Sequence, residues 1–217
     1  MDPENNHGPQ VPYLTEEEIR QKAAGFLAAA HPTGTIPIPI ELIVEKRGQD
    51  IVPLPGLHQN YQVDGCTSTD GSTVFVDQWM SQHRENRYRF TLAHELGHAV
   101  LHCGIFAEQE VGPQDLESWI ELRDAVDEST WRRFEWQANV FAGHVLVPRD
   151  ALREEFSRVL WEIKPLVSTA ISRGARKEAA TGPAWDKLVS QIAIHFQVSD
   201  EVIRRRLDKD GHNPSSL

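Results

Sequence analysis

The chain has 217 residues, of which 40% are hydrophobic and 25% are charged, values typical of a globular protein with one core and a small appendage. The formal net charge of −10 argues against non-specific binding to nucleic acid or to an anionic membrane surface. No apolar run approaches the about 18 residues of a membrane span, and residues 1–10 lack a signal-peptide pattern. The sequence therefore predicts a cytoplasmic protein, in which Cys66 and Cys103 are reduced thiols.

The first 80 residues predict short helices followed by a small sheet. Residues 1–13 are polar and rich in proline, which predicts a flexible tail. Thr15 followed by three glutamates is a typical helix start, and the apolar spacing extends that helix to about Ala30. A second short helix is expected over Ile40–Lys46. Three β-branched runs then predict strands, with a hairpin at Asp70-Gly71. These runs are Asp50–Leu54, Tyr61–Ser68 and Ser72–Asp77.

Helical patterns dominate the remainder of the chain. They cover residues 81–103, 115–125, 128–146, 149–160, 183–196 and 199–207. This order predicts an α+β fold. A small antiparallel-containing sheet should pack on the helix over 81–103, and a mainly helical C-terminal part should follow.

Residues 94–98 read His-Glu-Leu-Gly-His and are the most informative segment of the chain. On a helix, His94 and His98 lie four residues apart on one face, the spacing that holds a single Zn²⁺. Glu95 lies beside the first imidazole, where it can act as a base toward a metal-activated water without binding the metal itself. The flanking residues are mostly apolar, so the helix should be largely buried.

A catalytic zinc site needs a third protein ligand. Glu135 is one candidate, because Asn139 follows it by four residues on a predicted helix and could support a ligand imidazole by hydrogen bonding. The acidic segment 108–128 supplies competing carboxylates. Spacing alone does not decide between the two.

The sequence contains further histidines and tyrosines near the predicted site. His102 lies one more helical step beyond His98 and is expected to support a ligand or cap the helix rather than bind the metal. His144 should face away from the metal, and His195 is expected to pack in the core. The donor that would stabilise an oxyanion stays open among the residues Tyr61, Tyr88, His102 and His144.

Two blocks of the sequence resemble the ImmA/IrrE family of metallopeptidases. The first runs from Arg89 to His102 and contains His-Glu-Leu-Gly-His, and the second runs from Glu135 to Pro148 and begins Glu-Trp-Gln-Ala-Asn. The resemblance implies a bacterial or phage-related cytosolic endopeptidase of the gluzincin type. It implies that Glu135 is the third metal ligand, and that Glu95 is the catalytic base.

The resemblance also shapes the expected cofactor, partners and domains. Two imidazoles and one carboxylate suit Zn²⁺ best, with Mn²⁺ or Fe²⁺ as alternatives. A dedicated protease that cleaves a DNA-binding repressor, in a regulatory or stress-response role, is the nearest match. The expected organisation is a zinc-peptidase-like domain over 14–150 and a helical subdomain over 151–208, with flexible tails at 1–13 and 209–217.

The C-terminal helices support a rival hypothesis. Residues 188–207 have the pattern of a helix-turn-helix pair, and three consecutive arginines, Arg204–Arg206, could contact phosphate. On this reading the chain is a non-catalytic regulator or toxin–antitoxin component that binds protein or DNA. Acidic residues around the second helix and the net charge argue against direct DNA binding.

Overall fold

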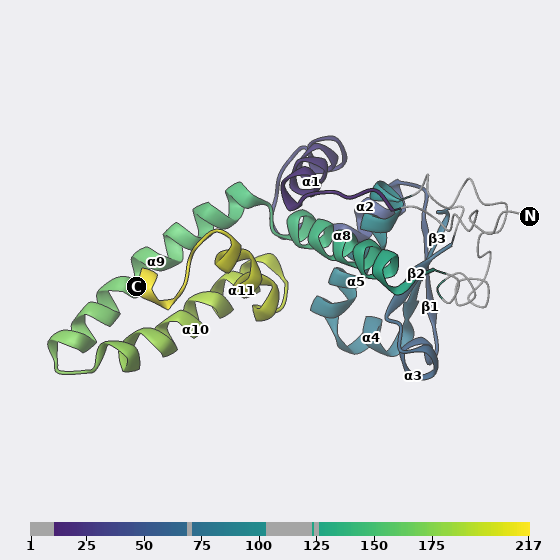
Figure 1. The fold of residues 1–217 in the computed structure, drawn as a ribbon. Helices are drawn as coiled ribbons and strands as arrows, with labels where there is room; N and C mark the ends of the chain where they lie inside the picture. The colour runs from purple at the N-terminus through teal and green to yellow at the C-terminus, as the bar shows by residue number, and fades with distance from the viewer. Residues whose placement is uncertain (1–10, 69–70, 103–122, 124–125) are drawn as a thin grey trace, which may run out of the picture. The chain divides into compact units, whose positions relative to one another are not determined.

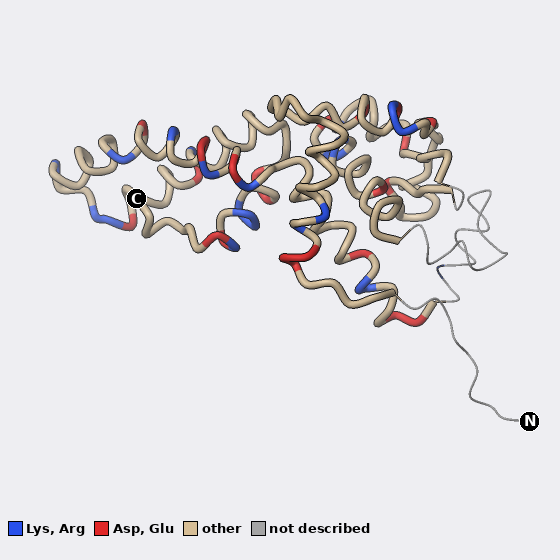
Figure 2. The backbone as a smooth tube through the Cα atoms, turned by 90° about the horizontal axis from the view of Figure 1, so that it is seen from above, with Lys and Arg blue, Asp and Glu red and all other residues tan. Residues whose placement is uncertain are grey.

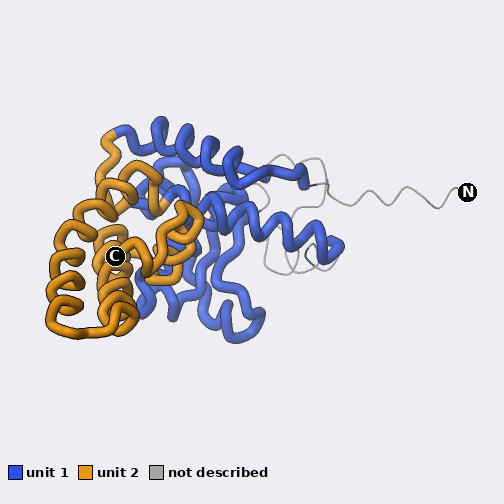
Figure 3. Tube along the Cα trace, turned by 60° about the vertical axis from the view of Figure 1, so that its left-hand side comes forward, with its two compact units in different colours: residues 1–32, 39–145 blue, residues 33–38, 146–217 orange. Residues whose placement is uncertain are grey.

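The computed structural model describes residues 11–68, 71–102, 123 and 126–217 (Figure 1). These form an α+β fold with a small mixed sheet and a helical C-terminal part, as predicted. The chain divides into two compact units (Figure 3). Unit 1 comprises residues 1–32 and 39–145, and unit 2 comprises residues 33–38 and 146–217.

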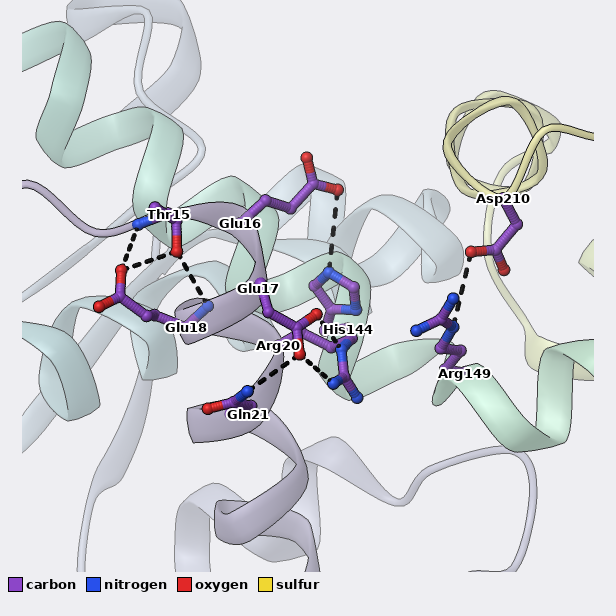
Figure 4. A network of polar contacts seen from close by, with 9 residues as sticks. All are labelled: Thr15, Glu16, Glu17, Glu18, Arg20, Gln21, His144, Arg149 and Asp210. Atoms are coloured by element: carbon purple, nitrogen blue, oxygen red, sulfur yellow. Dashed lines mark hydrogen bonds and ion pairs between the residues drawn. The ribbon is translucent and has the colours of Figure 1, made fainter.

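Unit 1 begins with two helices whose bounds match the prediction. Helix α1 (Glu16–Ala30) is capped by Thr15, whose hydroxyl accepts the Glu18 N–H while the Glu18 carboxylate accepts the Thr15 N–H (Figure 4). This reciprocal pair satisfies two amides at the helix start. Helix α2 (Ile40–Lys46) follows. Preceding α1, Val11 is buried, and the backbone at residues 11–12 accepts hydrogen bonds from helix α8.

The sheet contains β1 (Asp50–Leu54), β2 (Gly65–Thr67) and β3 (Thr73–Asp77) in the order β1-β3-β2. Strand β3 pairs in parallel with β1 and antiparallel with β2. The predicted hairpin agrees with the antiparallel pairing and with the left-handed φ of +69° at Gly71, although Asp70 lies outside the described residues.

The predicted strand over Tyr61–Ser68 is wrong over residues 61–64: Tyr61 ends a short unpredicted helix, α3 (Leu57–Tyr61), residues 62–64 form no regular element, and the strand begins at Gly65. A long-range contact stabilises this short helix: the Asp77 carboxylate accepts the backbone N–H of His58 at 3.0 Å. The helix ends at Gln62, which adopts a left-handed conformation.

The helix predicted over 81–103 is two helices, α4 (Gln78–His83) and α5 (Glu85–Leu101). Asp77 caps α4 by accepting the Met80 N–H, and the chain turns at Arg84, whose φ of −137° is not helical. Helix α5 packs on α2, α4, β2 and β3. Its apolar residues Leu92 and Leu96 are fully buried.

Helix α8 (Glu128–Leu146) has the bounds predicted, and all of it except its last residue belongs to unit 1. Phe141 of α8 is fully buried and its ring lies 5.9 Å from that of Phe26 on α1. The helix predicted over 115–125 falls outside the described residues, apart from Arg123.

Unit 2 consists of α9 (Arg149–Ser172), α10 (Lys177–Phe196), α11 (Asp200–Lys209) and a short 3₁₀ turn, η1 (Pro214–Ser216). Helices α9 and α10 are longer than predicted, and each continues through an internal proline, Pro165 or Pro183. Such a proline costs about 3 kcal/mol through a lost hydrogen bond and a steric clash. Apolar residues buried on both sides of it, such as Ile163 and Val167 of α9, offset that cost.

Helices α10 and α11 form the predicted helix-turn-helix-like pair, joined by Gln197 in a left-handed conformation and by the Ser199 cap. The three arginines of α11 do not form one exposed row. Arg206 is buried and donates to the Val147 carbonyl, while Arg204 pairs with Asp186 on α10. Figure 2 shows acidic and basic residues interspersed along the backbone of this unit.

The prediction that His195 packs in the core is wrong. Its side chain is 43% exposed, and its Nδ1 lies 3.9 Å from a carboxylate oxygen of Glu155. The neighbouring Ile194 is 76% exposed. The buried face of α10 instead carries Leu188, Ile192 and Phe196. The position of His195 next to apolar residues in the sequence therefore did not place it on the buried face of the helix.

The C-terminal residues of unit 2 pack against its helices. The His212 ring stacks on Phe156 of α9 with centroids 4.2 Å apart. Arg149 and Asp210 form an ion pair (Figure 4), and Asn213 caps η1. Among the described residues, no helix combines the length and the apolar character needed to cross a membrane.

Asp77 connects three elements, so its replacement should destabilise the sheet end of unit 1. Its buried carboxylate accepts amide protons from α3 and α4. Burial alone would raise its pKa, but these hydrogen bonds outweigh burial and lower it. We expect Asp77→Asn to lower the free energy of unfolding by about 1–3 kcal/mol, because one amide loses its acceptor.

The loss should depend on pH in a defined direction. Because the folded-state pKa of Asp77 is lowered, its contribution is complete above about pH 5 and declines as pH falls below about 4. Urea unfolding of both proteins at several pH values measures the difference. Asp50→Asn, at the exposed start of β1, is the matched control. An unchanged difference at low pH would contradict this role of the carboxylate.

Candidate metal centre

Helices α5 and α8 bring three ligand atoms together. His94 Nε2 lies 2.9 Å from His98 Nε2 and 3.2 Å from Glu135 Oε2, and His98 Nε2 lies 3.6 Å from Glu135 Oε1. Ligand atoms about 2.0–2.2 Å from a tetrahedral zinc lie about 3.3 Å from one another, so the observed separations fit one such ion. Within the described residues, this is the one group of three or more such side chains that could hold a metal.

The two imidazoles differ in their electrostatic surroundings. Burial would lower the pKa of His94, but hydrogen bonding to Glu135 and the nearby Glu95 charge outweigh it and raise that pKa. Burial, with charge on His94 and His102, holds the pKa of His98 well below its usual range. His98 is therefore neutral near pH 7, the form that an imidazole needs in order to bind a cation.

Glu95 is buried beside this group and faces the sheet. Its Oε2 accepts a hydrogen bond of 2.8 Å from the Thr67 hydroxyl on β2. Burial raises the pKa of Glu95 to about 7, against the lowering effects of His94 and Thr67. Thr67 was not expected from the sequence, since it lies 28 residues from Glu95 and no local pattern distinguishes it.

Strand β2 approaches α5 closely at Gly65. A Cβ at this position would lie 2.6 Å from the Thr91 methyl carbon and 3.0 Å from the Phe75 carbonyl oxygen. A side chain there would displace either α5 or the strand. The glycine therefore allows β2 to bring Thr67 within hydrogen-bonding distance of Glu95.

A second close approach, at Gly97, joins α5 to α8. A Cβ at Gly97 would lie 3.1 Å from both the Cα and the carbonyl oxygen of Ala138, and 3.2 Å from the Phe141 ring. These are mostly backbone atoms of a helix, which cannot move independently. The glycine within His-Glu-Leu-Gly-His thus sets the distance between the two helices that carry His94, His98 and Glu135.

The Phe134 ring packs on two of the histidines. Its centroid lies 4.0 Å from that of His98, with the rings 25° from parallel, and 4.3 Å from that of His102. This stacking restricts rotation of the His98 ring about its side-chain bonds. Phe134 directly precedes Glu135, so the same turn of α8 supplies both a carboxylate of this group and the ring that packs on one of its imidazoles.

The structure brings Asn139 and His102 to the group. Asn139 donates to the Glu135 carbonyl at 2.8 Å, and its side chain contributes to the raised pKa of His94. His102, at the C-terminal end of α5, places Nδ1 3.1 Å from His98 Nδ1. Their supporting roles stay predictions.

The other candidates lie elsewhere or are otherwise engaged. His144 Nε2 lies 4.0 Å from a carboxylate oxygen of Glu16 on α1 (Figure 4). The Tyr88 hydroxyl donates to Glu41 of α2 at 2.9 Å, and Tyr61 is partly exposed at the end of α3. Cys66 is free and buried. Cys103 and most of the acidic segment 108–128 lie outside the described residues.

The family comparison agrees with this geometry. The family model for peptidase M78, an IrrE N-terminal-like domain, matches residues 45–208. The chain belongs to this family. It is therefore a metallopeptidase, and the resemblance seen in the two sequence blocks is confirmed. No curated protein matches the sequence.

In this M78 peptidase, the packing of Gly97 yields a stability prediction. We expect Gly97→Ala to lower the free energy of unfolding by about 1–3 kcal/mol, since the added methyl group contacts helix backbone. Any folded protein should also bind Zn²⁺ more weakly, because α8 carries Glu135. Thermal unfolding and a zinc-chelator competition measure the two effects.

Gly25→Ala is the matched control, because a Cβ at Gly25 in α1 meets nothing within 4 Å. There the substitution should stabilise the protein by up to about 1 kcal/mol through helix propensity. Equal stabilisation by both substitutions would show that Gly97 does not set the distance between the helices.

Proposed function

We propose that the chain is a zinc-dependent endopeptidase in which His94, His98 and Glu135 bind the metal and Glu95 is the general base. The observation that supports this most directly is the convergence of three ligand atoms from α5 and α8, with the buried Glu95 adjacent in sequence to a ligand. We further propose that the enzyme acts in the cytoplasm.

The proposed reaction is hydrolysis of a peptide bond by an activated water. A zinc ion at these ligands supplies Lewis acidity, which polarises a carbonyl and makes water nucleophilic near neutral pH. Glu95 accepts a proton from the attacking water and delivers it to the departing amine nitrogen. Such a base works best when its pKa lies near the operating pH. Burial raises the pKa of Glu95, and a bound cation would oppose that rise.

The donor set bears on the identity of the metal. Two imidazoles and one carboxylate favour Zn²⁺, and they also accept Mn²⁺ or Fe²⁺ when these are more available. Three protein ligands leave coordination positions for water and substrate, as a catalytic rather than a structural zinc site requires.

The proposed substrate is a protein, in particular a DNA-binding repressor with a helix-turn-helix fold. Family membership supports a protein substrate, and the narrower proposal rests on the resemblance to the ImmA/IrrE group. In the non-catalytic alternative, α10 and α11 would bind a partner or DNA. The assembled ligands and base favour catalysis, and burial of Arg206 removes one of the three arginines on which DNA contact would depend.

Two substitutions separate catalysis from metal binding. Glu95→Gln should retain zinc and lose about 10²–10⁴-fold in kcat, because the amide cannot accept the proton. His98→Ala should lose both zinc and activity, because a ligand is removed. Metal content by elemental analysis and peptide cleavage assays with the identified substrate measure these outcomes.

Glu85→Gln on the same helix is the matched control, since Glu85 is exposed. It should behave like the unmodified enzyme. Full turnover by purified, zinc-loaded Glu95→Gln protein would overturn the assignment of Glu95 as the base.

The substrate proposal is tested by comparing protein N-termini in cells that express the unmodified chain or the Glu95→Gln variant. We expect new termini in one or a few regulators only with the unmodified chain. Such termini would also identify the scissile bond. Broad cleavage of many unrelated proteins would contradict narrow specificity, and matching profiles in the two strains would favour the binding alternative.

A further inference from the structure

A continuous row of hydrogen bonds joins the N-terminal segment of unit 1 to a proposed metal ligand. Gln137 Nε2 donates to the Pro12 carbonyl at 2.7 Å, and Gln137 Oε1 lies 2.9 Å from His102 Nε2. His102 Nδ1 in turn lies 3.1 Å from His98 Nδ1. The side chains of Gln137 and His102 are almost completely buried, so water does not compete for these contacts.

The donor and the acceptor of each hydrogen bond in the row follow from the Pro12 carbonyl at its start. A carbonyl oxygen can only accept, so the Gln137 amide must direct its NH₂ group toward Pro12 and its oxygen toward His102. That oxygen also only accepts, so His102 Nε2 must carry a proton. A neutral His102 then has an unprotonated Nδ1, which accepts from His98 Nδ1–H.

The hydrogen bond between His102 and His98 determines which ring nitrogen of His98 carries the proton. With its proton on Nδ1, a neutral imidazole has its lone pair on Nε2. His98 Nε2 is the atom that faces His94 Nε2 and Glu135. The tautomer imposed from Pro12 is therefore the one that can bind a cation at this group.

We propose that the Pro12 carbonyl, acting through Gln137 and His102, fixes the tautomer of His98 that binds the metal. Gln137 and His102 are then positioning residues, and the segment at residues 11–12 orients them through the Pro12 carbonyl. This inference rests on the proposed function for the role of His98 as a ligand. Outer partners of this kind commonly contribute about 10–100-fold to metal affinity.

A separate contact provides a control for simple anchoring of the segment. Arg133 Nη1 donates to the Val11 carbonyl at 3.1 Å, one turn of α8 before Gln137. Arg133 holds the same segment but takes no part in the row of hydrogen bonds that leads to His98. A purely structural role for the segment would make both residues equally important.

The most direct test reads the tautomers in the unmodified full-length chain by long-range ¹H–¹⁵N correlation spectroscopy of the histidine rings. We expect His102 to be neutral with its proton on Nε2, and His98 to carry its proton on Nδ1, with and without added Zn²⁺. A proton on His102 Nδ1 would overturn the proposal, and this measurement requires no variant to fold.

The second test measures Zn²⁺ affinity by competition with a chromophoric chelator. Gln137→Met and deletion of residues 1–12 should each weaken binding about 10–100-fold. Pro12→Ala, which retains the carbonyl, and Arg133→Met should each change it less than about threefold. In folded Gln137→Met protein, confirmed by circular dichroism, the His98 and His102 tautomers should become mixed. Unmixed tautomers with unchanged affinity, or equal weakening by Arg133→Met, would overturn the proposal.

Failure of the proposed function gives a different result. If the unmodified chain bound Zn²⁺ but cleaved no protein, the proposed peptidase activity would be wrong. The affinity and tautomer measurements would still test whether Pro12, Gln137 and His102 fix the tautomer of His98. If it bound no Zn²⁺, His98 would not be a ligand and the proposed role of the row of hydrogen bonds would fall with it.

Discussion

The close contact between α5 and α8 at Gly97 is the constraint on which the rest of the site depends. His94 and His98 come from one helix and require only its regular geometry, but Glu135 reaches them because the backbone of Ala138 packs directly against Gly97. A contact of this kind leaves no room for a side chain. The short distance between the helices therefore brings a carboxylate from a second helix within 3.2–3.6 Å of both imidazoles.

Around this contact, unit 1 surrounds polar groups with partners from several elements. Glu95 is held by Thr67 of the sheet, His98 by the Phe134 ring and His102, and His102 by Gln137. Buried polar groups without partners would each oppose folding. The partners satisfy those groups and also fix their orientation, as a preorganised catalytic site requires.

The C-terminal unit has a different physical character. Its helices are stabilised mainly by apolar packing of α9 with α10, and by ion pairs such as that of Glu155 with Arg158. Acidic and basic residues are interspersed along its backbone (Figure 2). The helix-turn-helix-like pair is consistent with a packing subdomain, in which Arg206 donates to the Val147 carbonyl rather than to a ligand.

The sequence by itself determined the elements that depend on local periodicity and on motif spacing. It placed α1, α2 and α8 and set the two histidines on one helical face. With the second block, it also indicated Glu135. These features follow from interactions within a few residues of each other, for example the Thr15–Glu18 capping box, so a linear pattern is sufficient to predict them.

Only the tertiary structure decided the remainder, because the interactions concerned join residues far apart in the chain. Asp77 stabilises the unpredicted short helix α3 through the backbone N–H of His58, and apolar burial continues α9 through Pro165. Thr67 meets Glu95 only through the packing of β2 on α5. Likewise, Pro12 and Gln137 are 125 residues apart. No local pattern indicates such pairs, since their proximity results from how the helices and the sheet pack.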